Sequence, residues 1–176
     1  GRRNYLINYF KKAIDGRGLI MAADMQNSAP AMVDADKAFI VPGIYEKDYI
    51  PTIKKLLINQ KINAVISLND LELPLLTKHK IELEQTGAKV IVPSHDTINK
   101  AFDKWKTVQF LEKSGLKSPK TFIDLDKALQ AIKLGMLKFP LVLKPRWGSA
   151  SIGIAFPENM EELKLAYHLQ KLRLGR

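Results

Sequence analysis

The sequence predicts an α/β protein: a Rossmann-like domain with a parallel sheet over residues 1–93, followed by an α+β domain over residues 94–176. Before Ser94, short apolar runs alternate four times with amphipathic stretches, which is typical of parallel strands joined by helices. After Ser94 this alternation stops, and short helical patterns lead to a loop rich in glycine and serine. The change of pattern places the domain boundary near residues 93–102.

The first domain is expected to hold four strands and three helices. The expected strands cover residues 18–24, 37–42, 62–70 and 88–94, and the helices 4–14, 48–60 and 71–87. One face of the first helix carries Tyr5, Leu6, Tyr9, Phe10, Ala13 and Ile14. A doubly wound sheet would place a strand before this helix. We therefore expect that the sequence starts after the first strand; the alternative is a fold that begins with a helix.

The second domain is expected to begin with short helices that end at Gly115. A helix with Asp124 or Asp126 near its N-terminus and a final helix after Pro157 should follow. Two sets of apolar residues fall at helical spacing: Trp105, Val108 and Leu111, and Met160, Leu163 and Tyr167. We interpret the first set as core residues and the second as one face of the final helix.

The composition is that of an ordinary soluble globular protein, with 46% hydrophobic and 26% charged residues among 176. No apolar run reaches the roughly 18 residues that span a bilayer, and no secretory signal opens the chain. Cysteine is absent, which excludes disulfides, thiolate catalysis and cysteine zinc sites. A reducing, cytoplasmic location is consistent with this composition.

The formal net charge of +10 is the unusual property of the composition. It indicates either a solvated, lysine-rich surface or an anionic partner, such as nucleotide phosphates or nucleic acid. The lysines are scattered, and only Lys164 to Arg176 forms a local basic concentration. Because no nucleic-acid motif accompanies the charge, we favour a solvated surface with a small phosphate site.

A lysine ends the apolar run in FPLVLKPRWGSASIGI, residues 139–154, which is predicted to form a strand, a polar loop and a second strand. Leu141 and Leu143 would pack on one face, while Val142 and Lys144 point to the other. Small loop residues let backbone N–H groups approach a phosphate, and Lys144 would place an ammonium beside it. The alternative is a flexible surface hairpin with a solvated lysine. A Walker A loop is excluded, because here the lysine precedes the glycines.

Several segments, in order, resemble the ATP-grasp enzymes. PLVLKPRWGSASIGI resembles their strand–glycine-loop–strand, and FDKWKTVQFLEKSGLKSPKTF resembles the segment that precedes it. GRRNYLINYFKKAI, AADMQNSAPAMVDADKAFIVP and INAVISLNDLELPLL resemble the preceding pre-ATP-grasp domain. The similarity is to carbamoyl-phosphate-synthase-like ATP-grasp proteins and extends over essentially the whole chain. It implies a Rossmann-like pre-ATP-grasp domain without its first strand, followed by an incomplete α+β ATP-grasp domain.

The resemblance also implies nucleotide-binding roles for particular residues. Lys104 corresponds to the lysine that reaches nucleotide phosphate from a helix, and Lys144 to the strand lysine that contacts the phosphate and adenine region. The loop that folds over the phosphates corresponds to Gly148, Ser149, Ser151 and Gly153. Without the surrounding motif, Lys104 would be interpreted as a solvated helix lysine.

Two positions depart from the family pattern. Ala150 stands where the family often has glycine, and its conformation would be strained if φ were positive. Trp147 stands where a small or acidic residue is common. Its ring could cap the adenine, pack under the loop or be exposed, and we favour packing.

The resemblance implies ATP and Mg²⁺ as cofactors, with the magnesium ligands expected C-terminal to this chain. In the family, a hinge segment contacts adenine, acidic residues hold magnesium, and an arginine lies near the γ-phosphate. All of these follow the loop in the sequence. We interpret Glu158, Glu161 and Glu162 as helix N-terminal charges rather than as metal ligands. We therefore expect a catalytic domain that is incomplete, with no metal site and no assigned catalytic residue.

Polar residues also follow strands of the first domain. Asn69, Asp70 and Glu72 come after a predicted strand, at the edge where open α/β sheets bind ligands. They could orient a substrate or cap the next helix, and we favour the cap. Asp24 ends an earlier strand, but no glycine fingerprint accompanies it. The three histidines are too dispersed to predict a metal site.

These inferences predict the ATP-binding part of a carboxylate–amine ligase that acts through an acyl phosphate on small-molecule substrates. The chain is expected to be inactive by itself. One alternative is a non-catalytic nucleotide-binding or regulatory module, and a less favoured one is a basic nucleic-acid-binding domain. The sequence does not identify the carboxylate, the amine or the oligomeric state.

Overall fold

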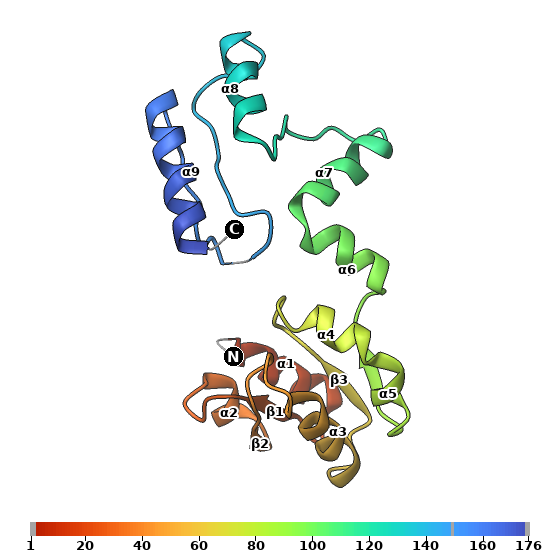
Figure 1. The fold of residues 1–176 in the computed structure, drawn as a ribbon. Coiled ribbons are helices and arrows are strands. Elements are labelled where there is room, and N and C mark those ends of the chain that lie inside the picture. The colour runs from red at the N-terminus through yellow and green to blue at the C-terminus, as the bar shows by residue number, and fades with distance from the viewer. Residues whose placement is uncertain (1–2, 149, 175–176) are drawn as a thin grey trace. The chain divides into compact units, whose positions relative to one another are not determined.

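The structure, a computed structural model, describes residues 3–148 and 150–174. It divides into two compact units, residues 1–92 and residues 93–176, each with its own packing. We call them the N-terminal unit and the C-terminal unit (Figure 1). No helix in the described ranges is long and apolar enough to cross a membrane.

The strands of the N-terminal unit pair in parallel, as the α/β prediction requires. They are β1 (Met21–Asp24), β2 (Lys37–Ile40), β3 (Ala64–Ile66) and β4 (Lys89–Ile91). β1 pairs with β2, setting Ala22 opposite Ala38, and β3 pairs with β4, setting Val65 opposite Val90. Within the described residues these pairs form two separate two-stranded sheets. The parallel α/β class is therefore confirmed, while one continuous sheet is not observed.

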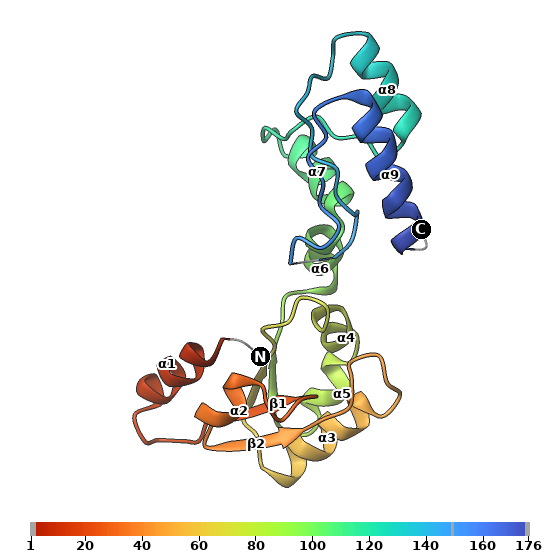
Figure 2. The same cartoon turned by 90° about the vertical axis from the view of Figure 1, so that its left-hand side faces the viewer.

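Helices connect the strands of this unit. They are α1 (Asn4–Ile14), α2 (Pro30–Asp34), α3 (Tyr49–Asn59), α4 (Leu73–Lys78) and α5 (Lys80–Glu84). The short helix α2 was not predicted, and it lies against β1 and β2 in both views (Figures 1 and 2). The single helix predicted over residues 71–87 is two helices that meet at His79. The His79 N–H still donates to the Leu75 carbonyl oxygen at 3.1 Å, so the helical path continues through the junction.

The core of the N-terminal unit forms between α3, the α4–α5 pair and the β3–β4 sheet. Its buried residues are Val41, Tyr49, Ile50, Ile53, Leu57, Leu76, Leu83, Ala88 and Val90. The spacing of Ile50, Ile53 and Leu57 places one stripe of α3 inside. On the other face of the sheet, Ile66 and Ile91 stand opposite one another and are exposed.

The apolar face predicted for the first helix is not the face that packs. Tyr5 and Tyr9 are exposed and meet each other edge to face, with ring centroids 5.9 Å apart. Ile7 is the buried residue of α1. The Asn4 side-chain amide, on the same face as Ile7, donates to Asp34 at 2.9 Å.

The C-terminal unit consists mainly of helices. They are α6 (His95–Phe102), α7 (Lys104–Lys113), α8 (Leu125–Lys133) and α9 (Met160–Leu174). Buried apolar residues come from α6, α8 and α9: Ile98, Ala131 and Leu163. On α7, Trp105, Val108 and Leu111 are only partly buried. The face of α9 predicted to carry Met160, Leu163 and Tyr167 does turn inward, with Leu163 at its centre.

Candidate functional site

The hairpin predicted around Lys144 is present, although its two arms are not regular strands. Leu143 and Ala155 form an antiparallel bridge, with N–H to carbonyl distances of 2.9 Å and 2.8 Å. Leu141 and Leu143 are half-buried, whereas Val142 and Lys144 are exposed. The predicted alternation therefore holds, and the Lys144 side chain lies on the open face of the arm.

The loop after Lys144 uses a backbone conformation that glycine adopts easily. Gly148 has φ of +111°, and Gly153 has φ of +74°. Ala150 and Ser151 also have positive φ, at +57° and +59°. An L-residue in this region is strained, so the strain foreseen for an alanine at this position occurs. Ser149, one of the predicted phosphate-loop residues, lies outside the described residues.

Asp103 links the start of α7 to this loop. Its Oδ1 accepts the backbone N–H of Trp105 at 3.0 Å, as an N-cap does. The Arg146 guanidinium donates to both carboxylate oxygens, from Nε to Oδ1 at 2.8 Å and from Nη2 to Oδ2 at 2.7 Å. Asp103 is only 4% exposed. The hydrogen bonds from Arg146 are the main cause that lowers the pKa of Asp103.

Lys104 follows Asp103 and makes two contacts with the same loop. Its backbone N–H donates to the Arg146 carbonyl oxygen at 3.1 Å, and its Nζ donates to the Gly148 carbonyl oxygen at 2.9 Å. Partial burial is the largest cause that lowers the pKa of Lys104, and repulsion from the Lys144 ammonium adds to it. Two ammonium groups therefore lie close enough to repel each other, and a bound anion would relieve that repulsion.

The structure brings some of the predicted site residues together. Lys104 contacts Gly148, and Lys144 lies close enough to shift the pKa of Lys104. Ser151 accepts the Ile154 N–H through its carbonyl oxygen at 3.3 Å, which closes the loop. Gly153 accepts a hydrogen bond from Gln170 of α9. In the described part of the chain, Lys144 makes no hydrogen bond or ion pair, so its ammonium is available to a ligand.

Sequence reasoning missed the ion pair between Asp103 and Arg146. An N-cap signal was available, since Asp103 directly precedes an amphipathic run. Nothing in the local pattern indicated Arg146, because its partner lies 43 positions away in the sequence. Such a pairing depends on how the chain folds back on itself.

Trp147 lies beside the ion pair. The Arg146 guanidinium carbon is 4.6 Å from the centre of the Trp147 ring, within the range of a cation–π contact. The indole is still 39% exposed. Trp147 therefore packs against its neighbour in the loop while keeping part of the ring at the surface.

The acidic residues near the loop belong to the start of α9. The Glu162 carboxylate accepts the Glu158 N–H at 2.8 Å, and the Asn159 side chain accepts the Glu162 N–H at 3.0 Å. Glu161 pairs with Lys164 at 3.0 Å. These contacts fit their interpretation as helix N-terminal charges. Among residues 3–148 and 150–174, no group of three or more acidic, histidine or cysteine side chains could hold a metal ion.

In the N-terminal unit, the polar residues Asn69 and Glu72 after β3 form hydrogen bonds within the same unit. The Asn69 side chain accepts the Leu71 N–H at 3.1 Å. The Glu72 carboxylate accepts hydrogen bonds from Ser67 Oγ at 2.5 Å and from the hydroxyl of buried Tyr49. Burial and this carboxylate raise the pKa of Tyr49. The helix cap favoured for these residues is therefore wrong: Glu72 occupies the N-cap position of α4 without a side-chain cap hydrogen bond, because its carboxylate binds Ser67 and Tyr49 instead.

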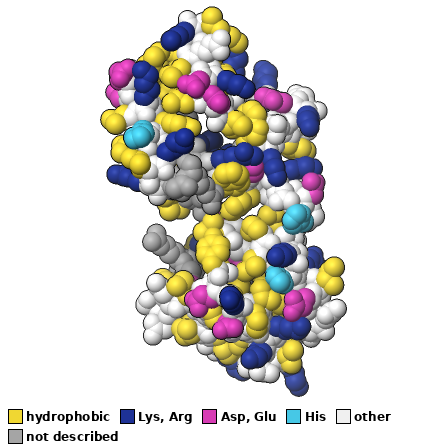
Figure 3. All heavy atoms as spheres, in the orientation of Figure 1, with side chains coloured by type: hydrophobic (Ala, Val, Ile, Leu, Met, Phe, Trp, Pro, Cys, Tyr) yellow, Lys and Arg dark blue, Asp and Glu magenta, His cyan; other side chains and the backbone are white. Residues whose placement is uncertain are grey.

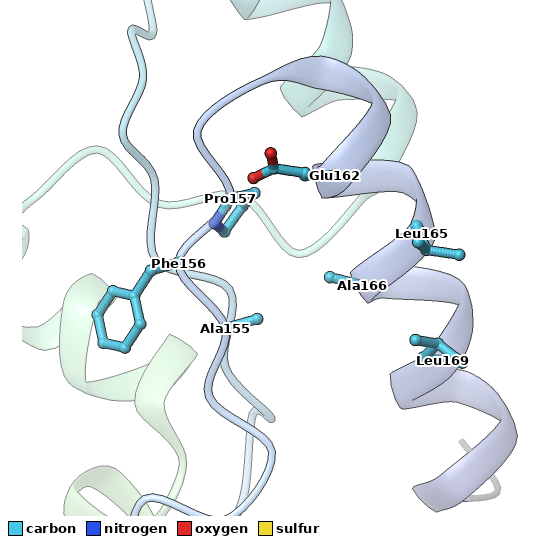
Figure 4. A pocket seen from close by; sticks show the side chains of 7 residues that line it. All are labelled: Ala155, Phe156, Pro157, Glu162, Leu165, Ala166 and Leu169. Atoms are coloured by element: carbon cyan, nitrogen blue, oxygen red, sulfur yellow. The ribbon is translucent and has the colours of Figure 1, made fainter.

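A groove of about 240 Å³ lies elsewhere in the C-terminal unit, between α9 and the arm after the loop. Ala155, Leu165, Ala166 and Leu169 line it, and the Phe156 ring points away from α9 (Figure 4). None of the predicted nucleotide-binding residues lines this groove. Its lining is mainly apolar, so it does not coincide with the phosphate site predicted around Lys104 and Lys144.

Comparison with known protein families identifies both parts of the chain. Residues 1–91 match the PylC-like N-terminal domain, and residues 101–172 match an ATP-grasp domain. The chain belongs to the ATP-grasp superfamily. This confirms the family predicted from the sequence, which is a superfamily of ATP-dependent enzymes. The ATP-grasp match spans Lys104, Lys144 and the loop.

Two curated relatives are similar over parts of their length. The coenzyme γ-F420-2:α-L-glutamate ligase of Methanocaldococcus jannaschii is 32% identical over 84 residues, which are 47% of this chain and 29% of the relative. The formate-dependent phosphoribosylglycinamide formyltransferase of Prochlorococcus marinus is 28% identical over 149 residues, 84% of this chain and 36% of the relative. The matches thus cover about a third of each relative.

Solved structures show the same fold. The biotin carboxylase domain of Hydrogenobacter thermophilus 2-oxoglutarate carboxylase, solved with MgADP and bicarbonate, has a TM-score of 0.65 at 20% identity. The L-amino acid ligase of Bacillus licheniformis has a TM-score of 0.65 at 18% identity. Each match covers 97% of this chain and 40% of the other.

Proposed function

We propose that this chain carries the phosphate-binding part of an ATP-dependent ligase that joins a carboxylate to an amine. The observation that supports this most strongly is the contact of Lys104 Nζ with the Gly148 carbonyl oxygen at 2.9 Å, which sets one ammonium against a loop that the exposed Lys144 precedes and in which Gly148 has positive φ. Two lysines that form no ion pair in the described residues favour a ligand that carries several negative charges. The triphosphate of ATP has this property, and ATP is the nucleotide of the family.

The loop suits a phosphate for a second reason. Gly148 has no side chain, and a Cβ added there would meet nothing within 4 Å, so the space above the backbone is open. Backbone N–H groups in such a turn can donate to phosphate oxygens. The residues present therefore fit the phosphates of ATP.

The residues present do not fit the magnesium ion that the family implies. Hard divalent cations take oxygen ligands, usually with one or two carboxylates. The carboxylates at the start of α9, those of Glu158, Glu161 and Glu162, are exposed. Glu161 accepts from Lys164, and Glu162 accepts from the Glu158 N–H and the Asn159 side-chain amide. We therefore derive no catalytic step through magnesium, and we propose that this chain alone does not turn over.

The proposed reaction has two transfers. A carboxylate oxygen of the substrate attacks the γ-phosphorus of ATP, which yields an acyl phosphate and ADP. The amine then attacks the acyl carbon, the C–O bond to phosphate breaks, and inorganic phosphate leaves with an amide formed. Lys104 and Lys144 would hold and neutralise phosphate oxygens during the first transfer.

A non-catalytic nucleotide-binding module is the second candidate, because the described residues contain no metal cluster. Nucleic-acid binding has less support. On the face drawn in Figure 3, lysine and arginine side chains are scattered over both units instead of gathering in one patch.

Trapping of the intermediate would separate the ligase from the module. The whole protein that contains this chain would be incubated with ATP, magnesium, pooled carboxylates and hydroxylamine. Hydroxylamine converts an acyl phosphate to a hydroxamate, so the ligase predicts hydroxamate and ADP that both depend on the carboxylate. ATP binding without either product would favour the non-catalytic module. ADP formation that is independent of carboxylate would contradict the ligase.

A further inference from the structure

The ion pair between Asp103 and Arg146 connects two parts of the proposed phosphate site. Asp103 is the N-cap of α7, the helix whose first residue is Lys104. Arg146 lies two residues after Lys144 and two before Gly148. The ion pair is bidentate. Among the charged side chains that the structure describes, that of Asp103 is buried. Such a pair fixes orientation as well as distance.

We propose that Asp103 and Arg146 are positioning residues, which preset the loop and Lys104 before the nucleotide binds. The proposal rests on the proposed function, and it requires neither residue to touch the nucleotide. Three contacts tie the loop to the first turn of α7: the bidentate ion pair, the bond from the Lys104 N–H to the Arg146 carbonyl, and the bond from Lys104 Nζ to Gly148.

The physical consequence is a smaller entropy loss on binding. A loop with several residues at positive φ samples many conformations unless its surroundings hold it. Holding it in advance removes that ordering cost from the binding step. The guanidinium of Arg146 is meanwhile paired with Asp103, whereas Lys104 and Lys144 form no ion pair with a carboxylate in the described residues.

Asp103→Asn is the informative substitution. Asparagine is an equally good N-cap, so α7 keeps its start, but the amide offers one acceptor oxygen and no charge to Arg146. Asp124→Asn is the matched control, because Asp124 caps α8 through the Lys127 N–H at 3.0 Å and forms no ion pair with arginine. We expect calorimetry to show ATP affinity lower by about tenfold in the first variant and nearly unchanged in the second.

This substitution distinguishes positioning from direct contact. If Arg146 instead bound phosphate, Asp103→Asn would free its guanidinium, and ATP affinity would stay the same or rise. That result would overturn the proposal. Melting of Asp103→Asn well above the temperature of the titration would show that a lower affinity does not reflect unfolding.

A second readout needs no nucleotide. In a Trp105→Phe background, Trp147 is the sole tryptophan, and its emission reports the stacked Arg146. We expect Asp103→Asn to change this emission and to speed hydrogen exchange of the Lys104 and Ile154 N–H groups, which donate to the Arg146 and Ser151 carbonyl oxygens of the loop. Asp124→Asn should change neither. Unchanged emission and exchange in Asp103→Asn would overturn the positioning role.

The two proposals fail in different ways. Loss of ATP affinity in Lys144→Ala with unchanged affinity in Asp103→Asn would overturn the positioning role and leave the proposed function intact. If the wild-type chain bound no ATP, the proposed function would fail, and the emission and exchange data would still decide whether the pair presets the loop.

Discussion

Ala150 occupies the left-handed region of backbone conformation, with φ of +57°, inside the loop that we assign to phosphate. A Cβ in this region costs roughly 1–2 kcal/mol. Ser151 follows it with φ of +59°. The loop therefore holds its shape against local strain, and the contacts of Asp103, Lys104 and Arg146 are the interactions that can offset it.

Replacing Ala150 by glycine should relieve this strain. We expect Ala150→Gly to raise the stability of the C-terminal unit by up to about 1 kcal/mol, after the extra chain entropy of glycine is subtracted. Thermal melting of the variant measures the change. Ala128→Gly, inside helix α8, is the control and should lower stability by about 1 kcal/mol. A loss as large in Ala150→Gly would show that the residue is not strained.

The Asp103–Arg146 pair should also make stability depend on acid. The pKa of Asp103 in the folded chain is lowered from 3.8, chiefly by Arg146. Its contribution to folding is therefore present above pH 3.8 and is lost as pH falls through the lower folded value. In urea unfolding between pH 5 and pH 2, Asp103→Asn should lose less stability than the wild type. Parallel curves for the two proteins would refute this contribution.

Among the elements, α3 holds the N-terminal unit together through one stripe of residues. Leu57 is 3% exposed, whereas its neighbour Ile58 is 54% exposed. The element was predicted over residues 48–60 and is observed over Tyr49–Asn59, because its apolar spacing matches the helical repeat.

Paired substitutions test this stripe. Leu57→Ala removes buried side-chain volume and should destabilise the N-terminal unit by about 2–5 kcal/mol. Ile58→Ala should change stability by about 0.5 kcal/mol or less, as exposed positions usually do. Urea unfolding of both variants supplies the comparison. Equal losses would mean that the outer face of α3 is packed as well.

Other elements show what local patterns leave undetermined. Periodicity located α1, but it did not identify the face that carries the buried Ile7 and the Asn4 contact with Asp34. The arms around Lys144 were predicted as strands, and only Leu143 and Ala155 form a bridge. A regular strand needs a neighbouring strand along its length. Whether such a neighbour is present depends on the tertiary structure, which a short window of sequence does not contain.

For the molecule as a whole, the order of segments carried more information than any single motif. Lys104 and Lys144 stand 40 positions apart, yet the family resemblance predicted a shared site, and Lys104 does contact Gly148 in the loop that follows Lys144. The site assignment itself stays a prediction until a ligand is bound. Arg146 was missed because its role depends on a partner in another segment.

Binding of ATP by this chain is the measurement that tests the central claim most directly. Calorimetric titration with ATP and magnesium would compare the wild type with Lys144→Ala and with Lys138→Ala, which changes an exposed lysine of the same unit outside the proposed site. A separate titration with a random DNA duplex tests the nucleic-acid alternative. We expect ATP binding that is lost in Lys144→Ala, kept in Lys138→Ala and absent for DNA. Equal ATP affinity in all three proteins would contradict the phosphate site, and salt-dependent DNA binding without ATP binding would favour a nucleic-acid partner.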